Sequence, residues 1–307
     1  MIRLFMDLLL DRHGELRQGW RVAAFICLVI LCVTAGILPL RLAGIGSPTL
    51  EKMLLLSSAL AATWTLTRFV NRKPVRAVGL WIHGGTLREL GAGCLLGFLM
   101  MGGVYIVEVA LGYVVPSSLG LGPAGALRVT VISVVWFAAG AMGEELLFRG
   151  YAFQSLIQGV TFLPATLIMS VMFGLAHLQN PHVTALSLCN VVAAGMLFSF
   201  AYMKTRSLWL PFGVHFAWNF SQTTLFGLPT SGLVDSSHAL FNAARSGPAW
   251  IGGGEFGPEG GVLATIALLA CLWYILKAGF LKPPEGIVTL DSIEDLVPGH
   301  GGGDRTR

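Results

Sequence analysis

Charged side chains are scarce in this 307-residue sequence. Asp, Glu, Lys and Arg make up only 12% of it, whereas a typical soluble protein carries about 25%. The hydrophobic fraction is 54% and the mean hydropathy is +0.73. A soluble domain of about 300 residues cannot enclose that much apolar surface. The shortage of charge therefore excludes an ordinary soluble protein and predicts a membrane protein.

Paired cysteines, a basic stripe and a cleavable leader are also missing. The five cysteines fall inside apolar segments without the spacing of a disulfide framework or a metal site, so we expect small buried side chains. The net charge of +4 does not come from a basic stripe with interleaved aromatic residues, so no nucleic-acid partner is expected. Residues 1–21 carry too many charges for a secretory signal peptide and are expected to form a cytoplasmic or interfacial segment.

Long apolar runs dominate what is present. A membrane-spanning helix needs about 20 mostly apolar residues. About eight runs meet this requirement, namely 22–43, 50–68, 90–115, 126–148, 161–178, 183–203, 207–226 and 261–281. The sequence therefore predicts an all-α fold, a polytopic membrane helix bundle of about eight transmembrane helices. The membrane domain is expected over residues 22–281, followed by a mobile tail over residues 282–307.

Glycine and polar residues suggest further local features. The Gly-rich segment 227–260 predicts a loop with one short helix near residues 236–246. The fourth helix is expected to continue to about Leu156, because only Gly150 discourages it. The small residues between Gly91 and Gly103 favour close packing of the third helix against a neighbour.

Basic residues are distributed unevenly between the two sides of the predicted membrane domain. With the N-terminus in the cytoplasm, the opposite side holds only a few of the 20 Lys and Arg residues: Arg41, Lys52, Arg128 and Arg245. Cytoplasmic loops carry an excess of Lys and Arg. We therefore expect an integral, multi-pass protein of the cell membrane with both termini cytoplasmic and the lipid bilayer as its surroundings.

Three charged groups interrupt the fourth apolar run, in the stretch WFAAGAMGEELLFRGYAF. Each charge at the centre of a spanning helix costs about 2.5–3.5 kcal/mol, and such residues normally mark a functional site. Glu145 and Arg149 are spaced i, i+4 on one helix face, which favours an ion pair. Glu144 points about 100° away. The pattern predicts one paired carboxylate and one that is free for chemistry.

Two later helices carry polar groups at the same spacing. FGLAHLQ places Phe173 and His177 at i, i+4, and GVHFAWNF does the same for His215 and Asn219. A lone intramembrane His most often hydrogen-bonds between helices. Two His, an Asn and a free Glu on three helices instead favour a site near the middle of the bilayer, where their positions along each helix place them.

These residue types suit hydrolysis of a peptide bond. Glu144 and His177 can share a water molecule and handle its protons as general acid and base. His215 and Asn219 carry donors that can stabilise the oxyanion of a tetrahedral intermediate, where losing one donor costs about 10²- to 10³-fold in rate. The sequence therefore predicts peptide hydrolysis inside the membrane or at its edge.

The motifs around these residues resemble a known family. EELLFR, FGLAH and HFAWN match, in order, the EExxxR, FxxxH and HxxxN motifs of the CPBP family (CAAX protease and bacteriocin-processing, or Abi) of intramembrane endopeptidases. The resemblance covers about residues 126–226 and implies that Glu144 and His177 activate water. It also implies an oxyanion site at His215 and Asn219, supported by Glu145 and Arg149. Phe173 is expected to pack against His177, and the substrate to be a membrane-associated peptide or protein.

Other interpretations remain open at this point. No cofactor is expected, but a divalent metal such as zinc is an alternative, because Glu and His are zinc ligands; against it, HExxH is absent and Asn219 is a poor ligand. A non-catalytic membrane immunity or sequestering protein that binds a peptide or partner is a second alternative. A transporter with Glu108, Glu144 and Glu145 as a proton relay is a third. Of the other histidines, His13, His83, His238 and His300 are expected to be solvated, and His182 is expected to have a role in a loop. No pattern predicts an oligomeric state.

Overall fold

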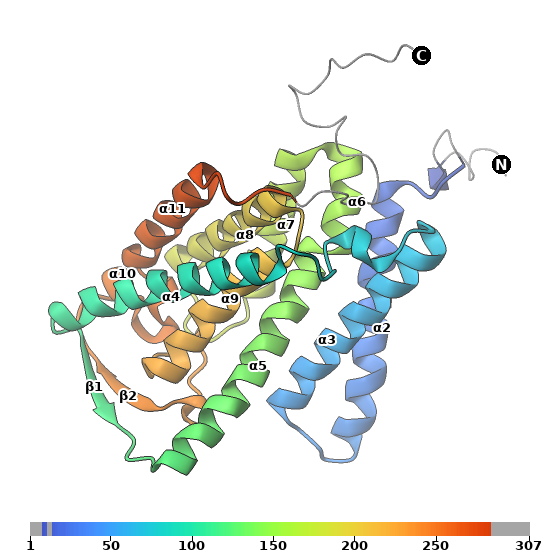
Figure 1. The fold of residues 1–307 in the computed structure, drawn as a ribbon. Helices are drawn as coiled ribbons and strands as arrows, with labels where there is room; N and C mark the ends of the chain where they lie inside the picture. The colour runs from blue at the N-terminus through green and yellow to red at the C-terminus, as the bar shows by residue number, and fades with distance from the viewer. Residues whose placement is uncertain (1–7, 11–13, 284–307) are drawn as a thin grey trace.

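The computed structural model describes residues 8–10 and 14–283 of the chain (Figure 1). Residues 1–7, 11–13 and 284–307 lie outside the described part. The mobile tail expected over residues 282–307 therefore falls almost entirely outside it. The interfacial segment expected over residues 1–21 is described only in part, and its last residues already belong to the first long helix, which begins at Gln18.

Helices make up most of the described chain. The helices are α2 (Gln18–Leu42), α3 (Pro48–Thr65), α4 (Thr86–Ala110), α5 (Pro123–Arg149), α6 (Tyr151–Val160), α7 (Phe162–Ala176), α8 (Ala185–Thr205), α9 (Trp209–Phe220), α10 (Ala249–Gly252) and α11 (Val262–Lys277). A π-helical turn extends α3 over Leu66–Val70 and another extends α9 over Ser221–Leu225. Short 3-10 turns cover Val75–Val78, Ser236–His238, Gly254–Phe256 and Pro258–Gly260.

The prediction of a helical membrane bundle is confirmed. Within the described residues, five helices are long and apolar enough to cross a membrane, and α7 and α11 are shorter apolar helices. Large apolar side chains on their outer faces are exposed, as lipid-facing positions are: Leu31, Leu99 and Leu167 are all more than half accessible. The count of eight spans stays a prediction.

Three local expectations are wrong. The fourth helix does not continue to Leu156: α5 ends at Arg149 and α6 begins at Tyr151. A Cβ on Gly150 would collide with the main-chain oxygen of Leu146, so the bend between the two helices requires glycine. Likewise α7 ends at Ala176, which places His177 in the turn after the helix rather than inside it.

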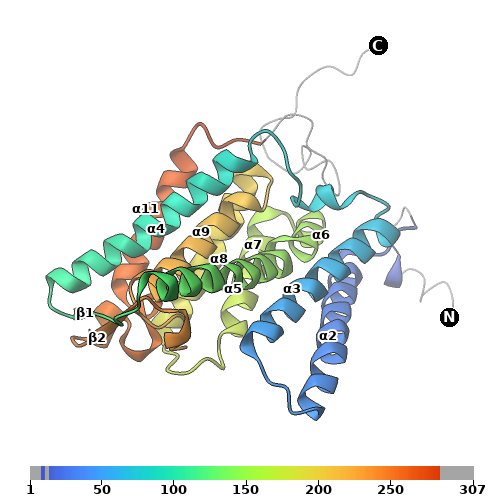
Figure 2. The same ribbon diagram turned by 60° about the horizontal axis from the view of Figure 1, so that its bottom comes forward.

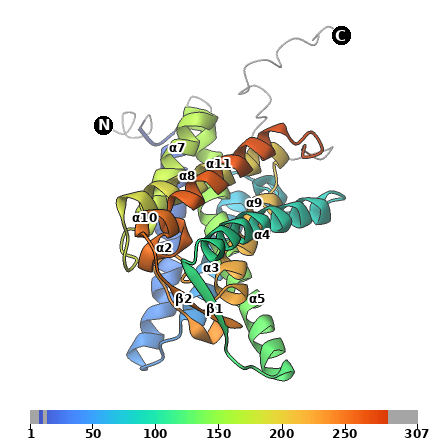
Figure 3. The same cartoon turned by 90° about the vertical axis from the view of Figure 1, so that its left-hand side faces the viewer.

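The third wrong expectation is the short helix near residues 236–246. Apart from the turn at Ser236–His238, this segment forms strand β2 (Phe241–Arg245). It pairs antiparallel with β1 (Val114–Ser118), in a register that joins Val114 to Arg245 and Ser118 to Phe241. Figure 3 shows this two-stranded ribbon beside the end of α4 and the start of α5. The backbone groups of both loops are therefore satisfied by each other.

Helix α5 lies at the centre of the arrangement. It contacts α3 on one side and α9 on the other, while α2 packs on α3 (Figures 1 and 2). Beyond α9 lie α4, α8 and α11, and α7 packs along α8. The motif-bearing ends of α5, α7 and α9 thus face one interior region, where Phe173, Phe198 and Val214 form part of the apolar core.

Glycines bring α4 and α9 into close contact, as the small residues between Gly91 and Gly103 predicted. A Cβ on Gly93 would collide with the main-chain oxygen of Leu210, and a Cβ on Gly97 with that of Val214. Close approach of backbones through small residues is the usual way in which membrane helices pack. This contact sets the position of α9, the helix that carries His215.

Replacement of Gly97 by Ala should therefore destabilise the protein. The added methyl group must push α4 away from α9, at an expected cost of about 1–3 kcal/mol. Gly103→Ala on the same helix is the matched control: nothing lies within 4 Å of its Cβ position, so it should be neutral or slightly stabilising. Thermal unfolding of both variants in detergent checks the prediction, and equal midpoints would contradict it.

Candidate active site

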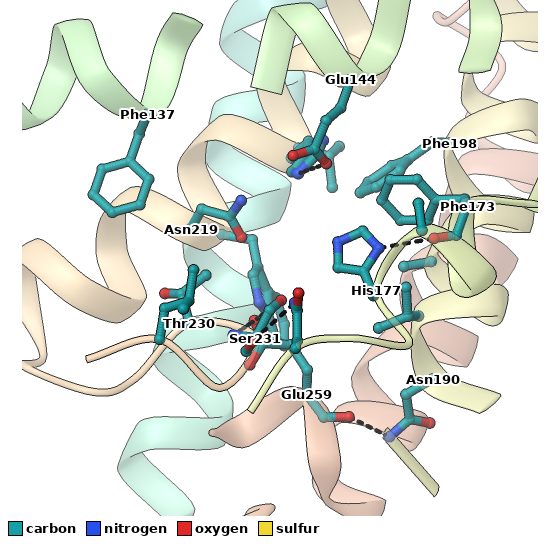
Figure 4. A pocket seen from close by; sticks show the side chains of 18 of the residues that line it. Phe137, Glu144, Phe173, His177, Asn190, Phe198, Asn219, Thr230, Ser231 and Glu259 are labelled. Atoms are coloured by element: carbon teal, nitrogen blue, oxygen red, sulfur yellow. Dashed lines mark hydrogen bonds and ion pairs between the residues drawn. The ribbon is translucent and has the colours of Figure 1, made fainter. Parts of the chain in front are cut away.

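A cavity of about 440 Å³ lies inside the bundle. Its walls come from α5, α7, α8 and α9 together with the segment before α11. Glu144, His177, His215 and Asn219, from three separate motifs, all line it. Figure 4 shows Glu144, His177 and Asn219 directed into the same space. The structure thus brings the four side chains together; their catalytic roles stay a prediction.

Glu145 and Arg149 form the ion pair that their spacing predicted. Arg149 Nη1 lies 3.3 Å from Glu145 Oε1, and both side chains are fully buried. Arg149 Nη2 also donates a hydrogen bond of 2.9 Å to the main-chain oxygen of Gly195 on α8. The guanidinium lies 4.7 Å from the ring centre of Phe173 and 5.1 Å from that of Phe198. Arg149 therefore links α5 to both α7 and α8.

His215 completes this buried network. Its Nδ1 lies 2.9 Å from Glu145 Oε1, and its Nε2 lies 3.7 Å from Glu144 Oε2. The ring stacks on Phe198 at 4.9 Å. Because a carboxylate oxygen only accepts, Nδ1 carries the hydrogen that bonds Glu145. Sequence reasoning paired Glu145 with Arg149 alone and missed His215, since nothing in the spacing of two separate helices indicates that contact.

His177 is held in one orientation by the helix that precedes it. Its Nδ1 lies 2.8 Å from the main-chain oxygen of Phe173. A carbonyl oxygen only accepts, so Nδ1 carries the hydrogen and Nε2 keeps a free lone pair. Phe173 also packs edge-on against the His177 ring, with 4.7 Å between centroids, as expected. The turn after α7 thus presents a proton acceptor in the cavity wall.

Glu144 and Asn219 are the most available polar groups of the set. The Glu144 side chain remains 25% exposed, whereas Glu145 beside it is fully buried. Asn219 is partly buried, and its amide makes no hydrogen bond within the described part of the chain. Glu145 is therefore the carboxylate that is closely paired, whereas Glu144 has only the longer contact with His215 and stays partly exposed.

Sequence reasoning missed three charged residues that line the cavity. Lys52 on α3 extends beside Gly140 with its Nζ 4.0 Å from the ring centre of Trp136. Asp235 and Glu259 enter from the loops before and after β2. None of the three belongs to a recognisable motif. The only feature of the sequence that could have indicated them is a charged residue within or beside an apolar run.

Two histidines expected in solvent are buried. His238 is 6% exposed, stacks on Trp136 at 4.6 Å, and bonds Asp235 through Nδ1 at 2.8 Å. The His83 side chain is 3% exposed, with its Nε2 3.4 Å from Glu89. The expectation failed because a position in a loop does not show which helices the loop packs against. His13 and His300 lie outside the described residues.

The alternative roles for these acidic and basic groups receive less support from the geometry. Glu108 is buried but does not line the cavity with Glu144, so the two are not placed as neighbours in a relay. Catalytic zinc sites normally use three protein ligands. Among residues 8–10 and 14–283, no group of three or more His, Cys, Asp or Glu is placed to hold a metal ion. The metal alternative is left to the chelator experiment below.

Comparisons with known proteins agree with the motifs. Residues 126–221 match the family model described as "Type II CAAX prenyl endopeptidase Rce1-like". A curated relative, named "Putative membrane peptidase YdiL", from Bacillus subtilis (strain 168), is 34% identical over 93 residues. That match covers 30% of this chain and 34% of the relative, so the chain spans about a third of the relative's length. No solved structure matches the chain. These findings support a membrane protease at the level of the family.

Proposed function

From the match of residues 126–221 to the Rce1-like family model and the likeness to a putative membrane peptidase, we propose that this chain is an intramembrane endopeptidase of the CPBP family. Its substrate in this proposal is a membrane-associated peptide or protein. The observation that carries the proposal is the convergence of Glu144, His177, His215 and Asn219 on one cavity. Apolar helices form much of the cavity wall, and an apolar surrounding strengthens the electrostatic interactions of the groups within it. The site therefore combines proton-handling groups with a largely apolar wall.

Glu144 and His177 activate the attacking water. A water between them donates one hydrogen to the Glu144 carboxylate and the other to the free Nε2 of His177. Glu144 takes the first proton as the water oxygen bonds the carbonyl carbon of the scissile peptide. The protonated Glu144 then gives this proton to the leaving nitrogen as the carbon–nitrogen bond breaks. The products are a carboxylic acid and an amine, and both residues return to their starting states.

His215 and Asn219 stabilise the negative oxygen of the intermediate. The Asn219 amide has no other partner within the described chain, so its hydrogens are free to donate. Glu145 holds the His215 ring through Nδ1. Nε2 lies 3.7 Å from Glu144, too far for a hydrogen bond, so a hydrogen on Nε2 is directed at the oxyanion. Arg149 fixes Glu145 in turn. Donors that are held in place before the reaction stabilise the transition state without reorganisation.

Cleavage of a candidate peptide library by purified protein in lipid vesicles tests this proposal. We expect cleavage that persists in the presence of a strong chelator, because Glu144 and His177 activate water without a metal. Activity that disappears with the chelator and returns with zinc would overturn the metal-independent step. Binding of peptides without any cleavage would instead favour the immunity or sequestering protein.

A further inference from the structure

The end of the cavity away from Glu144 is polar. In Figure 4, His177 and Asn219 lie in the middle of the cavity and Glu144 lies above them. Thr230, Ser231 and Glu259 lie below them. The loop from 229 to 235 and the turn before α11 supply these groups. The proposed mechanism uses none of them. Their position beside the reacting centre raises the question of what they bind.

Glu259 is the charged member of this polar end, and three elements hold it. Its carboxylate accepts hydrogen bonds from Gln222 Nε2 at 2.6 Å, in the π-helical extension of α9, and from the Ser231 main-chain nitrogen at 3.2 Å. Its main-chain oxygen accepts one from Asn190 Nδ2 of α8 at 2.8 Å. The carboxylate is thus bonded from the extension of α9 and from a loop, and its main chain is held from α8, so it is positioned rather than mobile.

This carboxylate makes no ion pair. Within residues 8–10 and 14–283, no Lys, Arg or His lies at salt-bridge distance from Glu259. Burial raises the pKa of the Glu259 carboxyl to about 7, although the hydrogen bonds from Gln222 and Ser231 act in the opposite direction. A buried charge without a partner is costly, and a cation beside it would offset much of that cost.

The charge of the cavity is divided between its two ends. Among the described residues that line the cavity, Lys52 is the one Lys or Arg. It lies over Trp136 on the α5 side, at the same end as Glu144. Asp235 is already bonded by Ser237 and His238. Glu259 is left at the other end without a cation, and a positive charge beside it would favour its ionised form. A ligand that reaches both ends therefore gains from a positive charge near Glu259.

We propose that Glu259 binds a cationic group of the substrate and so positions the scissile bond between Glu144 and His177. The cation is a Lys or Arg side chain, or the amino terminus of the peptide. This inference rests on the proposed peptidase function and adds a class of substrate to it. Glu259 is a specificity-determining residue in this account and takes no part in proton transfer.

Matched peptides cleaved by the wild-type protein give the first test. A peptide with Lys near the scissile bond should be cleaved with a kcat/KM about 10- to 100-fold higher than the same peptide with norleucine, which has similar bulk and no charge. Acetylation of the amino terminus separates the two sources. A preference that survives acetylation assigns the cation to the side chain, and one that disappears assigns it to the terminus. Equal cleavage of charged and uncharged peptides would overturn the inference.

Two variants from the same loop give the second test. Glu259→Gln should reduce the preference for the cationic peptide to less than about threefold. The cationic group of the peptide then donates to a neutral amide oxygen instead of a carboxylate. Glu255→Gln makes the same change at an exposed carboxylate that pairs with Arg245 outside the cavity, and should retain the full preference. Thermal unfolding reports whether each variant folds. A Glu259→Gln protein that folds and keeps the preference contradicts the proposal.

Binding separates this inference from the proposed function. Fluorescence anisotropy of the labelled peptides with the Glu144→Gln variant requires no cleavage. Tighter binding of the cationic peptide that is lost in the Glu144→Gln/Glu259→Gln double variant supports the inference. It does so even if the wild-type protein cleaves none of the peptides, because missing cleavage counts only against hydrolysis. Cleavage together with equal binding of both peptides would leave the peptidase standing and remove the role of Glu259.

Discussion

Glu144→Gln removes peptide cleavage, with an expected fall in kcat/KM of about 10²- to 10⁴-fold. The amide keeps the size and part of the hydrogen bonding of the carboxylate, but it cannot take a proton from water. The Glu144 side chain is 25% exposed, and its contact with His215 is 3.7 Å long, beyond hydrogen-bond distance, so the variant should fold normally. Cleavage of a defined peptide and thermal unfolding, measured on the same preparation, check both statements.

Glu51→Gln is the matched control for this experiment. Glu51 is an exposed carboxylate on α3 that pairs with Arg41 at 3.0 Å, and surface pairs of this kind contribute about 0–1 kcal/mol. Its replacement should change neither cleavage nor stability. A Glu144→Gln protein that folds and cleaves within about tenfold of wild type would show that another group activates the water.

Arg149→Met is expected to destabilise the protein by about 3–5 kcal/mol. Arg149 is fully buried and neutralises Glu145, bonds Gly195 and lies over two aromatic rings. Its removal leaves the Glu145 carboxylate buried with only His215 beside it. Unfolding in detergent, followed by circular dichroism, measures the loss.

Two comparisons show whether the unpaired charge is the cause. Adding Glu145→Gln to Arg149→Met removes the uncompensated carboxylate, so the double variant should be more stable than Arg149→Met alone. Arg41→Met breaks an exposed pair and should cost about 1 kcal/mol or less. If Arg149→Met and Arg41→Met unfold alike, the buried network does not hold α5 against α7 and α8.

The site was predictable to the extent that it depends on local spacing. Glu145 and Arg149 lie one helical turn apart, and their pairing follows from helix geometry alone. The packing of Phe173 on His177 followed in the same way. The contact between His215 and Glu145 did not, because it joins α9 to α5 across the bundle. Glu259 was missed for the same reason, since it reaches the cavity from a loop far along the chain.

The sequence by itself determined the membrane class, the helical character and the order of the three motifs. These depend on hydropathy and on periodicity over a few turns, which are properties of a short stretch of chain. Only the tertiary structure decided the bend at Gly150, the pairing of Val114–Ser118 with Phe241–Arg245, and the polar end of the cavity. Such features arise where distant segments compete for the same space and the same hydrogen bonds, and no local pattern records the outcome of that competition.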